Sequence, residues 1–189
     1  MNLFQFAKMP FSFQDGWNQV NLDRPSVLKT FFFLALPFSM IPALMLMYAG
    51  DHHAAAYRMS ANPARWYAVA QIFFVAELVT IALMGALIRQ VAATRKIAVN
   101  FERAFLLAAF TAIPMCLSSL GLAIPDMWAM IGIVVLGLLV AASLLYRGCY
   151  RILQMNEPME AQSLSAEVFA GGGVAWALLC GFVLLPLMT

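Results

Sequence analysis

Charged residues are scarce in this chain of 189 residues. Asp, Glu, Lys and Arg make up 11% of it, against about 25% of an ordinary soluble domain, whereas 63% of the residues are hydrophobic. A soluble protein of this size needs a charged shell around its core, and this sequence cannot supply one. The scarcity of charge therefore excludes a soluble globular fold and favours an integral membrane protein whose outer surface contacts lipid.

Residues that carry catalysis or metal chemistry are also few. The chain has two histidines and three cysteines, Cys116, Cys149 and Cys180, whose spacing fits neither a disulfide framework nor a zinc site. We expect these cysteines to be buried free thiols that pack as small hydrophobic groups. The sequence shows no nucleophile–base pair and no nucleotide-binding motif, so an enzyme is not expected. A net charge of only +2 argues against nucleic acid as a partner.

Five long apolar runs occupy most of the sequence after Lys29. They are Phe31–Gly50, Trp66–Ile88, Ala104–Pro125, Met127–Tyr146 and Val168–Thr189. A helix rises about 1.5 Å per residue, so about 20 residues span the ~30 Å hydrocarbon core, and a helix satisfies its own backbone hydrogen bonds there. The sequence therefore predicts an all-α fold, a polytopic bundle of five transmembrane helices that forms one domain over residues 30–189.

Residues 1–29 precede the first run as an arm with both polar and aromatic residues. No apolar stretch in it fits a secretory leader, so we expect the first run to insert and to stay in the membrane. The arm is rich in bulky apolar side chains, which favour an interfacial anchor on the cytoplasmic leaflet. A segment tucked against the bundle is an equal alternative. These side chains are Phe4, Phe6, Met9, Phe11, Phe13 and Trp17.

The loops between the runs differ in charge. The N-terminal arm and the second and fourth loops hold nine basic residues, and the opposite side holds only Arg58 and Arg65. Basic loops tend to remain in the cytoplasm. We therefore expect a cytoplasmic N-terminus and an external C-terminus. The nine residues are Lys8, Arg24, Lys29, Arg89, Arg95, Lys96, Arg103, Arg147 and Arg151.

The third and fourth runs are separated by the short segment Ala123–Met127. Asp126 is the only charged residue from Ala104 to Tyr146, a stretch too long for one membrane helix. Pro125 interrupts helices and Asp126 is a good N-cap, so we expect a helical hairpin with a tight turn.

Glu77 is the main candidate for a functional residue. It lies twelfth in the second run, close to the bilayer midplane, where a carboxylate costs roughly 2.5–3.5 kcal/mol on insertion scales. We expect it to be protonated at neutral pH and to face protein. Its expected partner is the hydroxyl of Thr111, Ser118 or Ser119, or a backbone carbonyl freed near Pro42 or Pro114. Thr80 follows on the same helix face. Two interpretations stay open: a site for a proton or an ion formed with Thr80, Ser118 and Ser119, or a neutral carboxyl that joins two helices.

A small group of metal-binding residue types lies on the outer side. Asp51, His52 and His53 open the first outer loop, and Asp126 is on the same side. Imidazoles and carboxylates suit zinc, copper or nickel, and this ion is the only cofactor that the sequence suggests. Adjacent histidines do not share one helix face, however, so a solvated polar loop is the competing interpretation.

Proline and glycine mark three of the runs. Pro37 and Pro42 lie in the first run and Pro114 in the third, where each removes a backbone hydrogen bond and predicts a kink. Gly171, Gly172 and Gly173 lie early in the fifth run and favour the close approach of another helix.

Three segments carry a resemblance to a known family. Ala112–Ser118, Ile124–Trp128 and Leu144–Gly148 resemble the Yip family (Ypt-interacting proteins) in its bacterial inner-membrane branch, and the likeness extends to the link Asn156–Ser165. The resemblance implies five spans, a cytoplasmic N-terminus and the bacterial inner membrane. Eukaryotic members are implicated in vesicle traffic with Rab-type GTPases. That role does not carry over, because this sequence lacks their Asp-Leu-Tyr-Gly-Pro-Phe-Trp type motif.

Together these features favour a non-enzymatic membrane protein of the Yip type. We expect it to organise the membrane or to bind partners within it, surrounded by lipid and as a homo-oligomer. The alternative is a small proton-coupled transporter or channel for a cation, a metal or a small solute, with Glu77 as the coupling group. The sequence identifies no protein partner.

Overall fold

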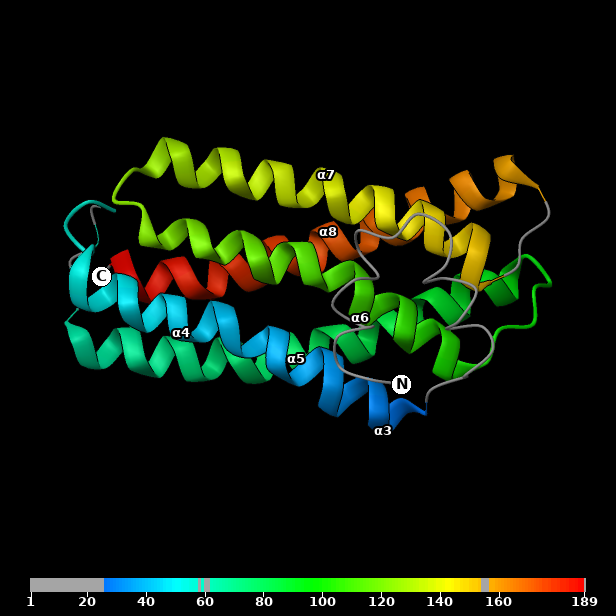
Figure 1. Ribbon diagram of the computed structural model, residues 1–189, viewed down its shortest axis with the longest axis horizontal. Coiled ribbons are helices and arrows are strands. Elements are labelled where there is room, and N and C mark those ends of the chain that lie inside the picture. The colour runs from blue at the N-terminus through cyan, green and yellow to red at the C-terminus, as the bar shows by residue number, and fades with distance from the viewer. Residues whose placement is uncertain (1–25, 58, 60–61, 154–156, 189) are drawn as a thin grey trace.

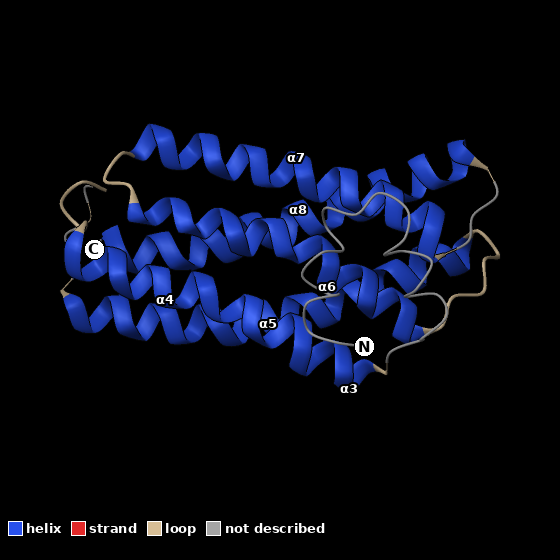
Figure 2. Cartoon of the chain, viewed as in Figure 1, coloured by secondary structure: helices blue, strands red, loops and turns tan. Residues whose placement is uncertain are grey.

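The computed structural model describes residues 26–57, 59, 62–153 and 157–188. Most of the N-terminal arm lies outside the described residues, so its interfacial role stays a prediction. The described part of the chain contains helices and no strands (Figure 2), and the predicted all-α fold is confirmed. Five helical segments are long and apolar enough to cross a membrane: Val27–His52, α5 (Pro63–Thr94), α6 with η2 (Phe101–Ala123), α7 (Met127–Ile152) and α8 (Pro158–Met188).

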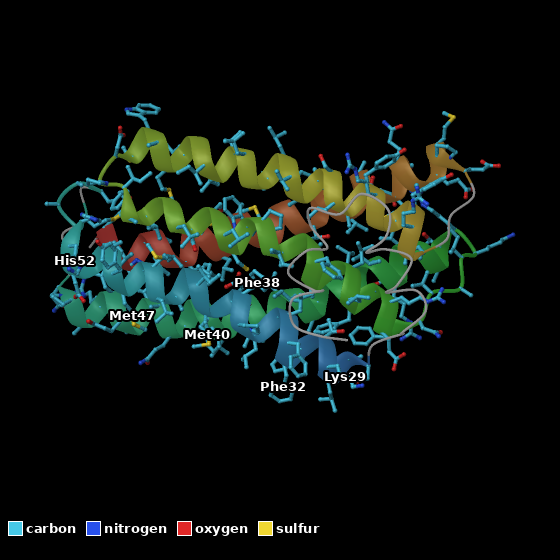
Figure 3. The ribbon with its side chains drawn as sticks, in the orientation of Figure 1. Lys29, Phe32, Phe38, Met40, Met47 and His52 are labelled. Atoms are coloured by element: carbon cyan, nitrogen blue, oxygen red, sulfur yellow. The ribbon has the colours of Figure 1, made fainter. Side chains whose placement is uncertain are left out.

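The first segment is composite. It consists of α3 (Val27–Thr30), the π-helix η1 (Phe31–Ala35) and α4 (Leu36–His52). Pro37 lies at the start of α4 and Pro42 lies buried inside it, so the widened π turn directly precedes the two positions that lack a backbone N–H donor. Phe32 and Met40 project from the outer side of this segment (Figure 3).

The helices extend beyond most of the predicted runs. The largest difference is in α8, which begins at Pro158, ten residues before the run predicted from Val168. An apolar run marks only the part of a helix that lies in hydrocarbon, whereas backbone hydrogen bonding continues past it. Pro158 suits the first helical position because its missing N–H would have no partner there.

The turn between the third and fourth spans agrees with the sequence. α6 (Phe101–Ser118) passes into the 3₁₀-helix η2 (Ser119–Ala123), and α7 begins at Met127. The Asp126 carboxylate caps α7 by accepting a hydrogen bond from the Trp128 backbone N–H at 2.8 Å. The predicted helical hairpin and its cap are confirmed.

α6 lies in the middle of the bundle (Figure 1) and packs against α5, α7 and the first segment, whereas α8 packs mainly against α5 and α7. Its residues Ala104–Phe110 are all buried, whereas α5 and α7 expose large apolar side chains such as Ile72, Leu83 and Leu136. An apolar exterior of this kind is stable only against lipid, because lipid does not penalise it as water does. The protein is therefore a multi-pass integral membrane protein.

Two groups of polar contacts join the ends of the bundle. At one end, named here the Tyr57 end, the Tyr57 hydroxyl donates to the Ile124 carbonyl at 2.6 Å, and the Tyr67 hydroxyl donates to Asp51 Oδ2 at 2.7 Å. At the opposite end, named the Arg95 end, the Arg95 guanidinium pairs with Glu167 and donates to Ser163 Oγ at 2.9 Å. These contacts join helices and turns at both ends in addition to the apolar packing between them.

Two buried apolar clusters fill the bundle. The larger lies toward the Arg95 end and is centred on α6, with Ile88, Leu107 and Leu145 among its members. The smaller lies toward the Tyr57 end and includes Trp66 and Leu187. Glu77 belongs to neither cluster, although it lies near the middle of α5.

Candidate functional site

Glu77 is buried in the bundle, with 9% of its surface exposed. Cys116 Sγ on α6 donates a hydrogen bond to its Oε1 at 3.1 Å. The other carboxyl oxygen, Oε2, is also buried and has no hydrogen-bond partner in the part of the chain that the structure describes. One oxygen of this carboxyl is thus held by the neighbouring helix, and the other remains available.

The hydroxyl groups that the sequence suggested as partners of Glu77 bond elsewhere. Ser118 Oγ donates to the Met115 carbonyl at 2.7 Å, Ser119 Oγ donates to the Cys116 carbonyl at 2.6 Å, and Thr111 Oγ1 donates to the Leu107 carbonyl at 2.9 Å. Each hydroxyl bonds to a backbone carbonyl of the continuous segment formed by α6 and η2, as is common for Ser and Thr in membrane helices.

Cys116 is the partner that sequence reasoning missed. A thiol is a weak donor and usually packs as a small apolar group, so its residue type gave no signal. The position of Cys116 was a usable signal, because it lies in the same stretch of α6 as the hydroxyls that were expected to bond to Glu77. Cys116, Cys149 and Cys180 are all free thiols, and the first two are buried.

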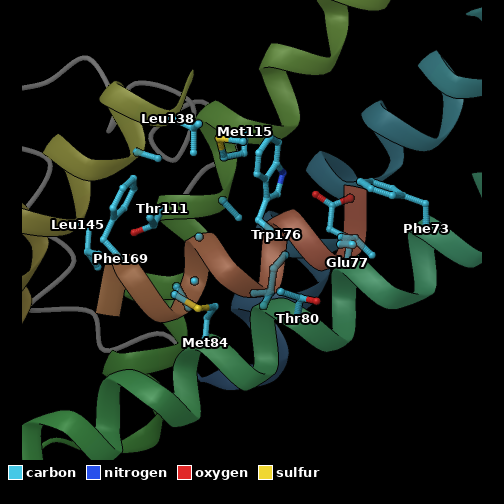
Figure 4. A pocket seen from close by; sticks show the side chains of 17 residues that line it. Phe73, Glu77, Thr80, Met84, Thr111, Met115, Leu138, Leu145, Phe169 and Trp176 are labelled. Atoms are coloured by element: carbon cyan, nitrogen blue, oxygen red, sulfur yellow. The ribbon is translucent and has the colours of Figure 1, made fainter. Parts of the chain in front are cut away.

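A pocket of about 110 Å³ opens beside Glu77, between α5, α6, α7 and α8. Figure 4 shows Trp176 next to Glu77, with Phe169 and Leu145 further along the pocket. We name it the Glu77 pocket. It is lined by Phe73, Glu77, Thr80, Ile81, Met84, Ala108, Thr111, Ala112, Met115, Leu138, Ala141, Leu145, Phe169, Gly172, Gly173, Trp176 and Leu179.

Polar groups in the lining are few. Thr80 Oγ1 donates to the Ala76 carbonyl at 2.8 Å, and Thr111 is bonded within α6, so neither hydroxyl hydrogen is free for a ligand. The lining includes no Lys, Arg or His. The Cys116 and Cys180 thiols interact electrostatically with Glu77, and a thiol carries no positive charge in either protonation state. An ionised carboxylate would therefore lie in an apolar site without a counter-ion, which favours its neutral form.

Glycine shapes the wall of the pocket that α8 contributes. A Cβ atom at Gly171 would come within 2.8 Å of Leu87 Cδ2, and one at Gly172 within 2.7 Å of Met84 Cε, so α8 lies close to α5 at both positions. A Cβ atom at Gly173 would meet no atom within 4 Å. The absence of side chains here leaves the pocket open.

The structure separates the metal-binding residue types. Among the described residues, no group of three or more His, Cys, Asp or Glu side chains lies close enough to hold one ion. Asp51 accepts a hydrogen bond from Tyr67, and His52 Nδ1 lies 3.0 Å from the Tyr48 carbonyl. Asp126 instead caps α7. Asp51, His52 and Asp126 thus each make a separate contact, and a metal site that includes them and His53 stays a prediction.

Comparison with known proteins gives one match. The model of the Yip1 domain family matches residues 8–179, which is most of the chain and includes every residue that lines the Glu77 pocket. No curated protein and no solved structure matches the sequence.

Proposed function

The chain belongs to the Yip1 domain family, and on that premise we propose that it is a non-enzymatic protein that binds a membrane-soluble partner in the Glu77 pocket. The observation that carries the proposal is the second oxygen of Glu77: Oε2 is buried beside an open pocket, and no group among the described residues bonds to it. Leaving a buried polar atom unpaired costs about 1–3 kcal/mol. A partner that bonds to this oxygen recovers that cost.

The position of the pocket decides how a partner reaches it. Glu77 lies in the middle of α5, with an apolar cluster on the side of each bundle end. A molecule dissolved in the bilayer meets this depth directly, whereas a hydrophilic solute has to cross one of the clusters. Binding from the hydrocarbon is therefore the function that this geometry supports best.

The proposal includes a location and an orientation. The Arg95 end carries basic residues from several helices, including Lys29, Arg95, Arg103 and Arg151, and the positive-inside rule assigns such an end to the cytoplasm. We place the protein in the bacterial inner membrane with its N-terminus in the cytoplasm and its C-terminus outside.

Photocrosslinking in native membranes tests the proposed binding. A photoreactive residue at Leu138 lines the pocket, and one at Val140 on the same helix is half exposed to lipid and serves as the matched control. We expect Leu138 to capture a defined species that Val140 does not capture. The replacement Gly173→Leu, which fills the pocket, should abolish the capture, and Gly181→Leu, at another open position of α8, should not. Equal labelling from both positions, unaffected by Gly173→Leu, would contradict the proposal.

Transport is the alternative function, and the same carboxyl favours it because intramembrane carboxyls often relay protons. Flux of protons and monovalent cations into proteoliposomes separates the two functions. A binding protein gives no flux above that of empty liposomes, whereas a proton-coupled carrier gives a flux that Glu77→Gln abolishes. The crosslinking experiment also covers self-association, because a second copy as partner would give a covalent dimer.

A further inference from the structure

From the donors and acceptors of the Glu77 pocket we infer the chemical class of its ligand: a neutral, lipid-soluble carbonyl compound whose oxygen accepts a hydrogen bond from the protonated Glu77 carboxyl. The inference rests on the proposed binding function and specifies, in addition, that the ligand is neutral and accepts a hydrogen bond. The observation is the asymmetry of the carboxyl, which has one oxygen engaged and the other buried without a partner.

The hydrogen bond from Cys116 assigns the two oxygens different roles. Oε1 accepts from the thiol at 3.1 Å and so acts as the carbonyl oxygen of a neutral carboxyl. The proton then resides on Oε2, which becomes a donor and requires an acceptor. Glu77 Oε2 has no acceptor among residues 26–57, 59, 62–153 and 157–188, and the Thr80 and Thr111 hydroxyls donate to their own helices. A ligand that brings an acceptor completes the set.

A cationic ligand fits the pocket less well. An ammonium group would need an ionised Glu77, and that carboxylate would have only a thiol donor and no positive charge in the lining to stabilise it before the ligand arrives. A neutral carbonyl avoids charge separation at this depth. It also enters hydrocarbon more easily than an ammonium ion does.

The size and walls of the pocket limit the ligand further. A cavity of about 150 Å³ accepts a benzene-sized molecule, and this pocket of about 110 Å³ suits a group of five or six heavy atoms. Phe73, Trp176, Met84 and Met115 contribute polarisable apolar surface, which packs well against a planar carbonyl group. The remainder of a longer molecule can extend into lipid through the open side of the pocket.

Three probes of similar shape test the inference: 2-pentanone, pentane and pentylamine, each added to the full chain in nanodiscs. The readouts are the midpoint of thermal unfolding, which rises with bound ligand, and the infrared C=O stretch of labelled 2-pentanone, which shifts when it accepts a hydrogen bond. We expect 2-pentanone to raise the midpoint most, with pentylamine giving no rise. The variant Glu77→Gln keeps an N–H donor and should retain binding, whereas Glu77→Leu should weaken it about tenfold.

Each contrary result has a separate meaning. Stabilisation by pentylamine that Glu77→Gln abolishes would show an ionised carboxylate and overturn the inference, while the pocket would remain a binding site. Equal stabilisation by pentane and 2-pentanone would remove the need for an acceptor and also overturn it. If no probe distinguishes the wild type from Gly173→Leu, with Gly181→Leu as the folded control, the proposed binding function itself fails. Because Glu77→Gln retains size and donor capacity, the test does not depend on the folding of Glu77→Leu.

Discussion

Glu77 and Cys116 form the one hydrogen bond that connects the buried carboxyl to a neighbouring helix in the described part of the chain. Sequence reasoning located the carboxyl correctly at mid-helix because an acidic residue in an apolar run is conspicuous. The sequence could not identify Cys116 as the partner of Glu77, because hydroxyls are better donors than thiols and α6 and η2 offer several of them. Those hydroxyls bond to carbonyls one turn back in their own helix, where no folding of the bundle is needed to bring the atoms together.

Two replacements of Cys116 separate its hydrogen bond from its packing, because Ala removes the donor and Ser keeps one. Cys116→Ala leaves both oxygens of Glu77 without a protein donor, so we expect the free energy of unfolding to fall by about 1–3 kcal/mol. Cys116→Ser keeps a donor of similar size and should stay close to the wild type. Unfolding in SDS, followed by circular dichroism, measures both. Equal losses in the two variants would show that packing at this position matters and that the hydrogen bond does not.

Tyr57 gives the Tyr57 end a pH dependence in the alkaline range. Burial, together with the negative charge of Asp126, raises the pKa of Tyr57 above the ordinary 10.0. The neutral phenol is the donor to Ile124, so its stabilisation is complete below the pKa of an unfolded tyrosine and is lost as the pH rises through the higher folded pKa.

The replacement Tyr57→Phe tests this dependence. It should lower the free energy of unfolding by about 1 kcal/mol at neutral pH and should remove the additional loss of stability that the wild type shows above pH 10.0. The matched control is Tyr146→Phe, because Tyr146 is exposed on α7. An alkaline transition of equal size in Tyr57→Phe would exclude Tyr57 as its cause.

At the scale of the helices, the sequence predicted where each span lies but did not predict which side of each helix is buried. A run such as Ala104–Phe110 is buried throughout, whereas Ile72, Val75 and Val79 on α5 are equally apolar and exposed. In a bilayer both environments are apolar, so hydrophobicity marks the length of a helix and does not mark its packing side. Small residues carry that information, and Gly85 is the clearest case, since it admits the backbone of α6.

Gly85 sets the distance between α5 and α6. A Cβ atom there would lie 3.0 Å from Phe105 Cα, a backbone atom that cannot rotate away. Gly85→Ala should therefore force the helices apart and lower the free energy of unfolding by about 1–3 kcal/mol. Gly132→Ala on α7 is the matched control, because no atom lies within 4 Å of its added Cβ. If both variants unfold alike in SDS, the close approach is not what stabilises this pair.

At the scale of the whole molecule, the apolar runs and the loop charges predicted five spans and one orientation, and the five apolar helices are present. The Glu77 pocket could not be predicted, because it arises where four helices meet around positions without side chains on α8. The sequence around a glycine does not show whether that glycine packs against another helix or lines a pocket. The metal site stays a prediction, and among the described residues Asp51, His52 and Asp126 each make a separate hydrogen-bond contact.

The orientation of the chain is tested with reporter fusions. Fusions after Asn100 and Asn156, in the second and fourth loops of the sequence, should report from the cytoplasm, and a fusion after Thr189 should report from outside. A reporter pair of opposite preference, alkaline phosphatase and green fluorescent protein, controls for expression at each site. A phosphatase signal from the first two positions would reverse the proposed topology.

Infrared difference spectroscopy of Glu77 tests the central claim most directly. With the carboxyls of glutamate labelled with ¹³C and the protein in nanodiscs at neutral pH, we predict a protonated C=O band that is present in the wild type and absent in Glu77→Gln. Addition of 2-pentanone should shift that band, because Oε2–H then donates to the ligand, and the shift should vanish in Gly173→Leu but persist in Gly181→Leu. The absence of the band would contradict a neutral Glu77, and a band that 2-pentanone leaves unchanged would contradict its role in binding.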